Sequence, residues 1–317
     1  MNFVRYMILL LGSLILTGCA SIVSNYLQSA DSFDYRSIGS SEQIAELGFT
    51  KREYCSANED RCTHYFIGEP LTSRRLQYQT EISSARSTTA VELSITRDSL
   101  PVYAPSTIVL IHGFRASKEF MVNTALYFRF LGFNVIVPDL LGHGDSAGAK
   151  TFGVIDSYVI NEIITKEHVS QRDLYLLGNS MGAVTATRIA SMRDDVRGLI
   201  LQSPMLNFSE AVYRYSNSNY PFLAGLIGDE AILEGASSAL SEANLTASDT
   251  DIMPILSSLS IPLLILTSSA DEVSPYASFA QLRGEQLTVK NLPNRNHPSM
   301  AVIGDKDSAI ILDWLER

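Results

Sequence analysis

The sequence has few basic residues, few charged residues overall, little proline or glycine, and no apolar run long enough to span a bilayer. Lys and Arg number 24 against 34 Asp and Glu, so the net charge is −10, and charged residues make up only 18%. An acidic surface repels phosphate groups, which argues against nucleic-acid binding. With 13 Phe and 14 Tyr the chain is not disordered, and 11 Pro with 19 Gly are too few for a fibrous protein.

The most apolar stretch, residues 6–16, is about half of the roughly 20 residues that a spanning helix needs. It follows Arg5 and leads into Leu16-Thr17-Gly18-Cys19. A positive residue before a short apolar core predicts an export signal, which we place at 1–18. The cysteine directly after it has a further interpretation, given below; the alternative is an ordinary signal or anchor in which Cys19 occurs by chance.

The junction at Cys19 resembles the lipobox of bacterial lipoproteins, in which the signal is cleaved before an acylated cysteine. That resemblance implies acyl chains (palmitate among them) on Cys19 and lasting attachment to a membrane of the bacterial cell envelope. Ala20 stands where an Asp would resemble the retention signal of the inner membrane. The outer membrane, with the protein facing the periplasm, is therefore favoured.

The other two cysteines are Cys55 and Cys62. In an exported chain they can form a disulfide, which would stabilise the fold by roughly 2–3 kcal/mol, and two free thiols are the alternative. They lack the four-ligand pattern of a structural zinc site. No metal and no organic cofactor is expected.

The first quarter of the chain has weak patterns. Residues 19–75 are expected to form a tether and an N-terminal extension, with a short helix at 41–47 and irregular structure over 46–75. Residues 76–97 alternate and are rich in Thr, Ser and Val, which predicts two strands joined by a turn near 84–88.

Short runs that are apolar on both faces follow, which is typical of a parallel sheet covered by helices. These expected strands are 107–111, 134–137, 174–177, 199–201 and 263–266. The expected helices between and after them are 117–131, 154–168, 181–192, 274–283 and 305–316. Alternation of strand and helix predicts an α/β doubly wound sheet over 76–317, and the long polar interruption at 205–258 predicts an inserted helical cap or lid.

Gly178-Asn179-Ser180-Met181-Gly182 has the pattern G-x-S-x-G, between an apolar strand and a helix. In that context the pattern predicts a nucleophile elbow, a tight turn that holds Ser180 in a strained conformation at the carboxyl edge of the sheet. A serine acyl enzyme also needs two backbone N–H donors for its oxyanion. We expect them at Met181 and at Phe114, in the loop His112-Gly113-Phe114 after another strand.

The base and the acid follow from chain order, which in this architecture is serine, acid, histidine. Of the 5 histidines, only His297 follows Ser180. Asp271 lies in the loop 268–273, after the apolar strand at 261–267, where its carboxylate can hold the second imidazole nitrogen. Its neighbour Glu272 is the rival. His112 and His143 are expected to be structural.

In combination these motifs resemble the α/β-hydrolase superfamily, over about 76–317, with the monoglyceride-lipase and serine-aminopeptidase-like branches as the nearest look-alikes. The resemblance implies a mostly parallel eight-stranded sheet flanked by helices and a Ser–Asp–His triad. It does not fix the substrate.

The expected activity is hydrolysis of carboxylic esters, small or lipid-like, through an acyl-Ser180 intermediate. An aminopeptidase or amidase on the same scaffold is one alternative, and it needs a carboxylate for the substrate amine; Glu210, Asp229, Glu230, Glu234 and Glu242 are candidates. A non-catalytic envelope lipoprotein that keeps the fold is another. The sequence does not indicate the oligomeric state.

Overall fold

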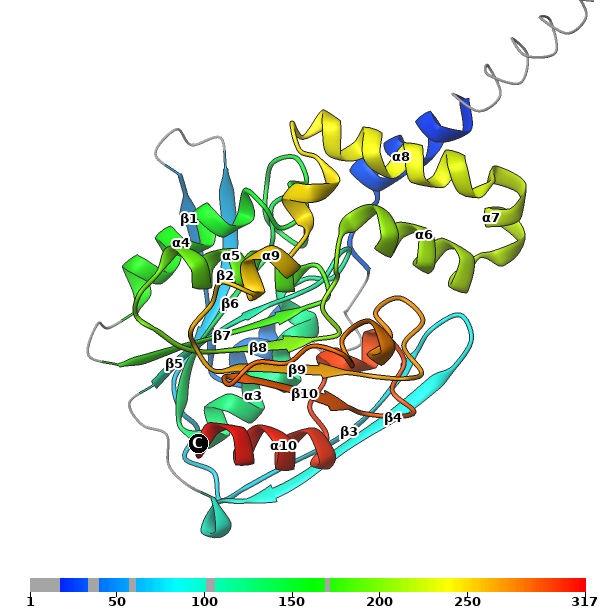
Figure 1. Cartoon of the computed structure of the whole chain (residues 1–317). Helices are drawn as coiled ribbons and strands as arrows, with labels where there is room; N and C mark the ends of the chain where they lie inside the picture. The colour runs from blue at the N-terminus through cyan, green and yellow to red at the C-terminus, as the bar shows by residue number, and fades with distance from the viewer. Residues whose placement is uncertain (1–17, 34–39, 57–60, 101–105, 169–171) are drawn as a thin grey trace, which may run out of the picture.

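A mostly parallel sheet forms the centre of the molecule (Figure 1). The computed structural model describes residues 18–33, 40–56, 61–100, 106–168 and 172–317. The sheet has eight strands in the order β1-β2-β6-β5-β7-β8-β9-β10. Its strands are β1 Phe49–Cys55, β2 Cys62–Gly68, β5 Ser106–Ile111, β6 Phe133–Pro138, β7 Asp173–Asn179, β8 Val196–Gln202, β9 Leu263–Thr267 and β10 Leu287–Asn291.

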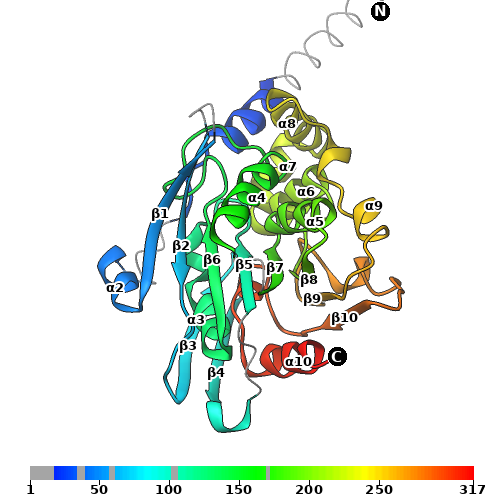
Figure 2. The ribbon, with the colours of Figure 1, turned by 90° about the vertical axis from the view of Figure 1, so that its left-hand side faces the viewer.

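Helices cover both faces of this sheet, as Figure 2 shows from the side. Helices α4 (Asp156–Glu167) and α5 (Gly182–Met192) pack in one core, and α3 (Val122–Leu131) and α10 (Asp305–Leu315) in the other. Successive residues of β5 serve the two cores in turn, because side chains alternate along a strand. The expected fold class, an α/β hydrolase fold, is confirmed.

The cap consists of helices on one side of the sheet (Figure 1): α6 (Phe208–Asn219), α7 (Pro221–Ile227), α8 (Asp229–Glu242) and the short α9 (Met253–Leu256). Pro221 stands in the first turn of α7, where its missing N–H costs no hydrogen bond. Gly228, at φ +87°, separates α7 from α8. A short helix α2 (Ser41–Glu46) precedes the sheet, with Ser40 and Gln43 forming a capping box.

Two sequence-based expectations are wrong. Residues 46–75, expected to be irregular, contain β1 and β2, which extend the sheet at one edge by antiparallel pairing. The sheet therefore begins at Phe49, ahead of the start expected at 76. Residues 274–283, expected to form a helix, hold only a single 3₁₀ turn at Tyr276–Ser278. Hydrogen bonds from the Ser274 hydroxyl to Pro204 O and from Tyr276 N to Ser268 O tie this segment to neighbouring loops instead.

The expected strand pair at 76–97 is present as β3 (Arg75–Ser83) and β4 (Thr88–Thr96), but it lies outside the main sheet. The two strands form an antiparallel ribbon that packs on α10. In Figure 1 the tip of this ribbon points toward the cap.

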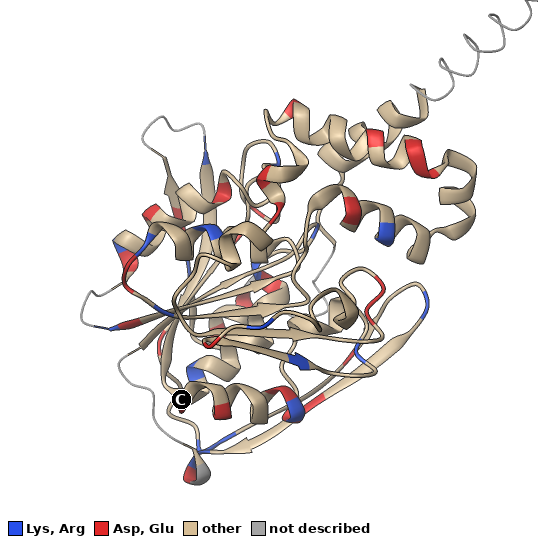
Figure 3. Cartoon of the chain, viewed as in Figure 1, with Lys and Arg blue, Asp and Glu red and all other residues tan. Residues whose placement is uncertain are grey.

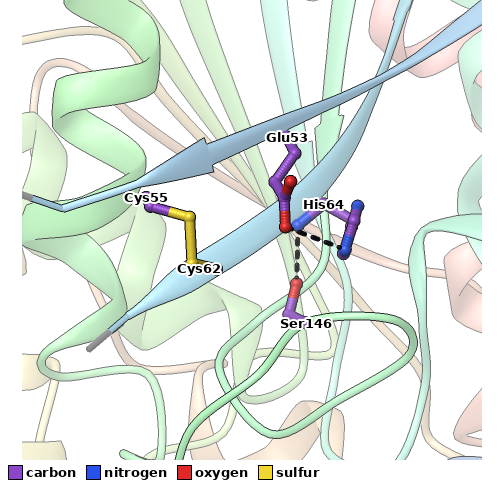
Figure 4. The surroundings of a disulfide bond; sticks show 5 residues. All are labelled: Glu53, Cys55, Cys62, His64 and Ser146. Carbon is purple, nitrogen blue, oxygen red and sulfur yellow. Dashed lines mark hydrogen bonds and ion pairs between the residues drawn. A yellow bond between two sulfur atoms is a disulfide. The ribbon is translucent and has the colours of Figure 1, made fainter. Parts of the chain in front are cut away.

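Cys55 and Cys62 are joined by a disulfide at the end of the β1–β2 hairpin where β1 connects to β2 (Figure 4). They are direct cross-strand partners, with Cα atoms 4.0 Å apart, so the bond ties the end of this edge hairpin. Two residues along β2 from Cys62, the backbone N–H of His64 donates to the Ser146 hydroxyl at 2.8 Å. This contact connects the hairpin to the loop after β6.

Candidate active site

Ser180 lies in a tight turn between β7 and α5, with φ at +50°. A side chain rarely adopts this left-handed conformation, so the turn is strained and is held by its surroundings. The two flanking glycines make the turn feasible: a Cβ at Gly178 would lie 2.5 Å from Gly182 O, and one at Gly182 would lie 2.3 Å from Ile111 O. The elbow geometry expected from G-x-S-x-G is therefore present.

The structure brings Ser180, His297 and Asp271 together from three separate loops. Nε2 of His297 lies 2.9 Å from Oγ of Ser180, and Nδ1 lies 2.8 Å from Oδ2 of Asp271. His297 follows β10, and Asp271 follows β9. The imidazole is thus in place to accept the serine proton on one nitrogen while the carboxylate holds the other.

Asp271 is almost fully buried, and its second oxygen, Oδ1, accepts hydrogen bonds from the backbone N–H groups of Val273 and Ser274. Burial raises the pKa of this carboxyl, but the nearby His297 and these hydrogen bonds outweigh burial and hold the pKa below its ordinary value. The carboxylate form that an imidazolium needs beside it is therefore favoured. The rival Glu272 faces elsewhere: its side chain is half exposed and pairs with Arg86 at 3.1 Å.

The loop after β5 lies directly against the elbow. A Cβ at Gly113 would be 3.0 Å from Cβ of Ser180, closer than most Cβ contacts in proteins, so glycine suits this close approach of the two backbones. Phe114 follows Gly113, and Met181 follows Ser180 at the start of α5. The two residues expected to supply the oxyanion donors therefore belong to adjoining backbone segments on either side of the nucleophile.

His112 and His143 contact the loop at Gly113 and Phe114 and stabilise it. His112 is fully buried; its Nε2 accepts from Leu140 N at 3.0 Å, which leaves Nδ1 to donate to Gly113 O at 2.8 Å. His143 packs its ring edge-on against Phe114, with centroids 5.7 Å apart. Asp139 accepts from both the backbone N–H and the ammonium of the buried Lys118, each at 2.7 Å. All three side chains have structural partners.

Burial of these two histidines predicts that stability falls with acidification. Burial lowers the pKa of His112 to about 4 and of His143 to about 3, against 6.5 for a free histidine. Between those values and 6.5 the unfolded chain binds more protons than the folded one, so stability is complete above about pH 6.5 and declines as the pH falls. From pH 7 to 5 each histidine should lower the free energy of unfolding by about 2 kcal/mol.

Urea unfolding at the two pH values measures this decline. A His143→Gln variant cannot take up the proton and should lose about 2 kcal/mol less than the unmodified chain over the same interval. An equal loss in both chains would contradict the assignment.

A cavity of about 800 Å³ opens above Ser180 and His297. Its walls are mostly apolar and come from four parts of the chain: the cap, the loops at the sheet edge, the tip of the β3–β4 ribbon, and the N-terminal segment at 18–33. Among the described residues of the lining, the only carboxylate is that of Glu272. The cavity is suited to an uncharged, largely apolar ligand.

The N-terminal segment is a part of this site that the sequence did not indicate. Residues 18–29 are helical, and the segment after them is fastened to Arg115, next to Phe114. The Arg115 guanidinium donates to Asp31 O and to the Tyr26 hydroxyl and lies 4.3 Å from the ring centroid of Phe33. What was expected to be a plain tether therefore forms one wall of the cavity.

The β3–β4 ribbon positions the histidine loop. Nδ2 of Asn296, the residue before His297, donates to Ile82 O and Ser87 O, each at 3.0 Å. At the ribbon tip, Arg86 donates to Asn217 O at the end of α6 and pairs with Glu272. The ribbon thus links the cap, the acid loop and the histidine loop across one side of the cavity.

Cys19, the residue expected to carry the acyl chains, is half-buried with a free thiol at the start of the N-terminal helix. Residues 1–17, which hold the apolar run of the expected signal, lie outside the described residues. Within the described ranges, none of the helices combines the length and the hydropathy that a membrane crossing requires.

The sheet order, the serine elbow and the histidine between serine and carboxylate form the arrangement that serine hydrolases of the α/β class use. Residues 104–231 match the model of the family described as serine aminopeptidase, S33. The chain has the α/β-hydrolase fold, is similar to this family over the middle of its length, and is a hydrolase.

Curated relatives share modest sequence identity with the chain. An uncharacterised protein of Bacillus subtilis, YqkD, is 28% identical over 194 residues, which are 57% of this chain and 60% of that protein. The chain thus spans less than two thirds of that relative. A non-heme chloroperoxidase of Streptomyces lividans is 25% identical over 230 residues, covering 60% of this chain and 81% of that enzyme.

Solved structures share the fold. A membrane phospholipase A, described as a bacterial virulence factor, aligns over 99% of this chain and 98% of its own, with a TM-score of 0.56 and 18% identity. An esterase of Pyrococcus furiosus aligns over 77% of this chain and 91% of its own, with a TM-score of 0.51 and 15% identity.

Proposed function

We propose that this hydrolase cleaves carboxylic esters with an apolar acyl group through an acyl-Ser180 intermediate. The observation that carries the proposal is the Ser180–His297–Asp271 chain of hydrogen bonds, at 2.9 and 2.8 Å, at the base of an apolar cavity of about 800 Å³. We also propose that Cys19 is acylated and attaches the protein to the bacterial cell envelope, with the outer membrane favoured.

The proposed reaction has two halves. His297 removes the proton of the Ser180 hydroxyl as Oγ attacks the ester carbonyl, and the N–H groups of Phe114 and Met181 hold the resulting oxyanion. The tetrahedral intermediate breaks its bond to the alcohol oxygen, which takes the proton from His297. Water, deprotonated by the same imidazole, then attacks the acyl-Ser180 carbonyl and releases the acid, and Ser180 recovers its proton.

Charge in the cavity favours an ester over an aminoacyl substrate. The candidate carboxylates for an amine lie outside the lining, and several have other partners: Glu210 pairs with Arg214, Glu242 accepts from Ser24, and Asp229 accepts from Tyr213. Glu272 is in the lining but is paired with Arg86. A substrate ammonium would therefore have no unpaired carboxylate among the described lining residues.

A substrate series tests this proposal. Because each buried methylene contributes about 0.8 kcal/mol, kcat/KM should rise roughly tenfold from p-nitrophenyl acetate to the butyrate. Aminoacyl p-nitroanilides should react far more slowly than either ester. A preference for the aminoacyl amides would contradict the proposal and favour an aminopeptidase.

A further inference from the structure

The two helices that border the mouth of the cavity carry no charged residue. They are the N-terminal helix at 18–29 and α7, and Figure 3 shows both without an acidic or a basic position. The chain as a whole carries 58 charged side chains, counted as 24 basic and 34 acidic. Two uncharged helices at one opening are therefore a local departure from the rest of the surface.

Large apolar side chains on these helices face solvent. On the N-terminal segment, Ile22 is 66% exposed, and Tyr26 and Phe33 are also exposed. On α7, Phe222 is 87% and Leu226 73% exposed, and Leu223 is about half exposed, as is Tyr220, the residue before this helix. We call these seven side chains the apolar rim; a contiguous group of this kind marks an interaction surface more often than a single exposed leucine does.

The apolar rim is continuous with the cavity. Ile22, Tyr26, Phe33, Tyr220 and Leu223 are exposed and also line the cavity, so the opening lies between the two parts of the rim. Phe222 and Leu226 lie outside the lining and four residues apart, on one face of α7. An apolar molecule that enters the cavity therefore crosses an apolar border.

The two parts of the rim are held together by α8. The opposite face of the N-terminal helix packs on α8: a Cβ at Gly235 would lie 2.5 Å from Cβ of Val23, and Gln28 donates to Ala239 O at 2.6 Å. Figures 1 and 2 both show the two helices side by side. The burial of this face orients the remaining side chains outward.

The position of Cys19 points to what covers the rim. Cys19, Ile22 and Tyr26 are spaced by three and four residues, so they lie on one face of the helix. The apolar run at 6–16 precedes this helix directly, outside the described residues. If the signal is removed, the proposed acyl chains on Cys19 attach beside the rim. If residues 6–16 remain as an anchor, that segment joins the protein at the same place.

We infer that the apolar rim docks on a lipid bilayer and that ester lipids pass from the bilayer between α7 and the N-terminal helix into the cavity. The inference rests on the proposed ester hydrolysis and names its substrates as esters dissolved in the membrane. Since the seven rim side chains are uncharged and the chain is acidic, docking depends mainly on apolar burial, with Arg115 beside Tyr26 and Phe33 as the nearby cation.

Indole fluorescence tests docking without any enzymatic readout. The only tryptophan of the chain, Trp314, is buried in α10 and gives a constant background. A Phe222→Trp variant of the full-length chain, reconstituted into phosphatidylcholine vesicles with brominated acyl chains, should lose about half of its added fluorescence by quenching. Tyr158→Trp, at an exposed position on α4, is the matched control and should be unquenched. An unquenched indole at 222 overturns the inference.

Two ester substrates, one dissolved in vesicles and one dissolved in water, test lipid entry. Phe222→Ser with Leu226→Ser should lower hydrolysis of a diacylglycerol ester dissolved in phosphatidylcholine vesicles about tenfold or more, and leave soluble p-nitrophenyl butyrate unaffected. Tyr158→Ser with Met192→Ser, which removes exposed apolar groups elsewhere, should change neither rate. An unreduced rate of diacylglycerol hydrolysis on vesicles in the rim variant overturns the inference. If the rim variant also changes from dimer to monomer while keeping that rate, the rim is instead the contact with a second copy of the chain. Quenching at 222 without hydrolysis of either ester supports docking and overturns the proposed function instead, so the two failures are distinct.

Discussion

Replacing Ser180 with alanine is expected to lower kcat for p-nitrophenyl butyrate by about 10⁶-fold. The reason is geometric: Oγ of Ser180 is the hydroxyl held 2.9 Å from Nε2 of His297, and without it no acyl-enzyme can form. The residual rate would come from water in a site that still binds the ester and stabilises its oxyanion. The same variant should lose covalent labelling by a fluorophosphonate.

The control for Ser180→Ala is a measurement of whether the variant remains folded. Alanine differs from serine by one oxygen and keeps the strained turn at φ +50°, so thermal unfolding should shift little. A folded Ser180→Ala variant that hydrolyses the ester at the rate of the unmodified chain would exclude Ser180 as the nucleophile.

Asp271→Asn is expected to lower kcat by about 10⁴-fold at neutral pH. The carboxylate accepts the Nδ1 proton of His297 at 2.8 Å and so leaves Nε2 free to receive the proton of Ser180. An amide at this position can present its NH₂ group to Nδ1, which favours the opposite tautomer, and it carries no charge to stabilise the imidazolium.

Glu272→Gln is the matched comparison, because it makes the same chemical change one residue along the chain. Glu272 is half exposed, pairs with Arg86 and contacts Ser218, and it makes no hydrogen bond to the imidazole among the contacts of the described residues. We expect its loss of rate to be less than tenfold, since exposed ion pairs contribute little. Rates measured in parallel decide between the two carboxylates, and a larger loss in Glu272→Gln would contradict the assignment of Asp271.

The central sheet could be predicted because its strands are short and apolar on both faces. A strand such as Ser106–Ile111 has no exposed side, so its composition alone identifies it. The edge strand Phe49–Cys55 escaped prediction because it is mostly exposed and carries Lys51, Arg52 and Glu53. An edge strand of this kind has neither a continuous apolar run nor a regular alternation to mark it.

Chain order and local turns alone were enough to select Ser180, Asp271 and His297 as candidate catalytic residues, without knowledge of the distances between them. The tertiary structure decided what surrounds them. The helix at 18–29 contacts α8, more than 200 positions away, through Val23 and Gly235, and the β3–β4 ribbon reaches Asn296 over a similar separation. Contacts between segments so distant leave no periodic pattern in either segment, since each depends on shape complementarity that forms only when the chain folds. The walls of the cavity, and the apolar rim at its mouth, are therefore properties of the folded molecule.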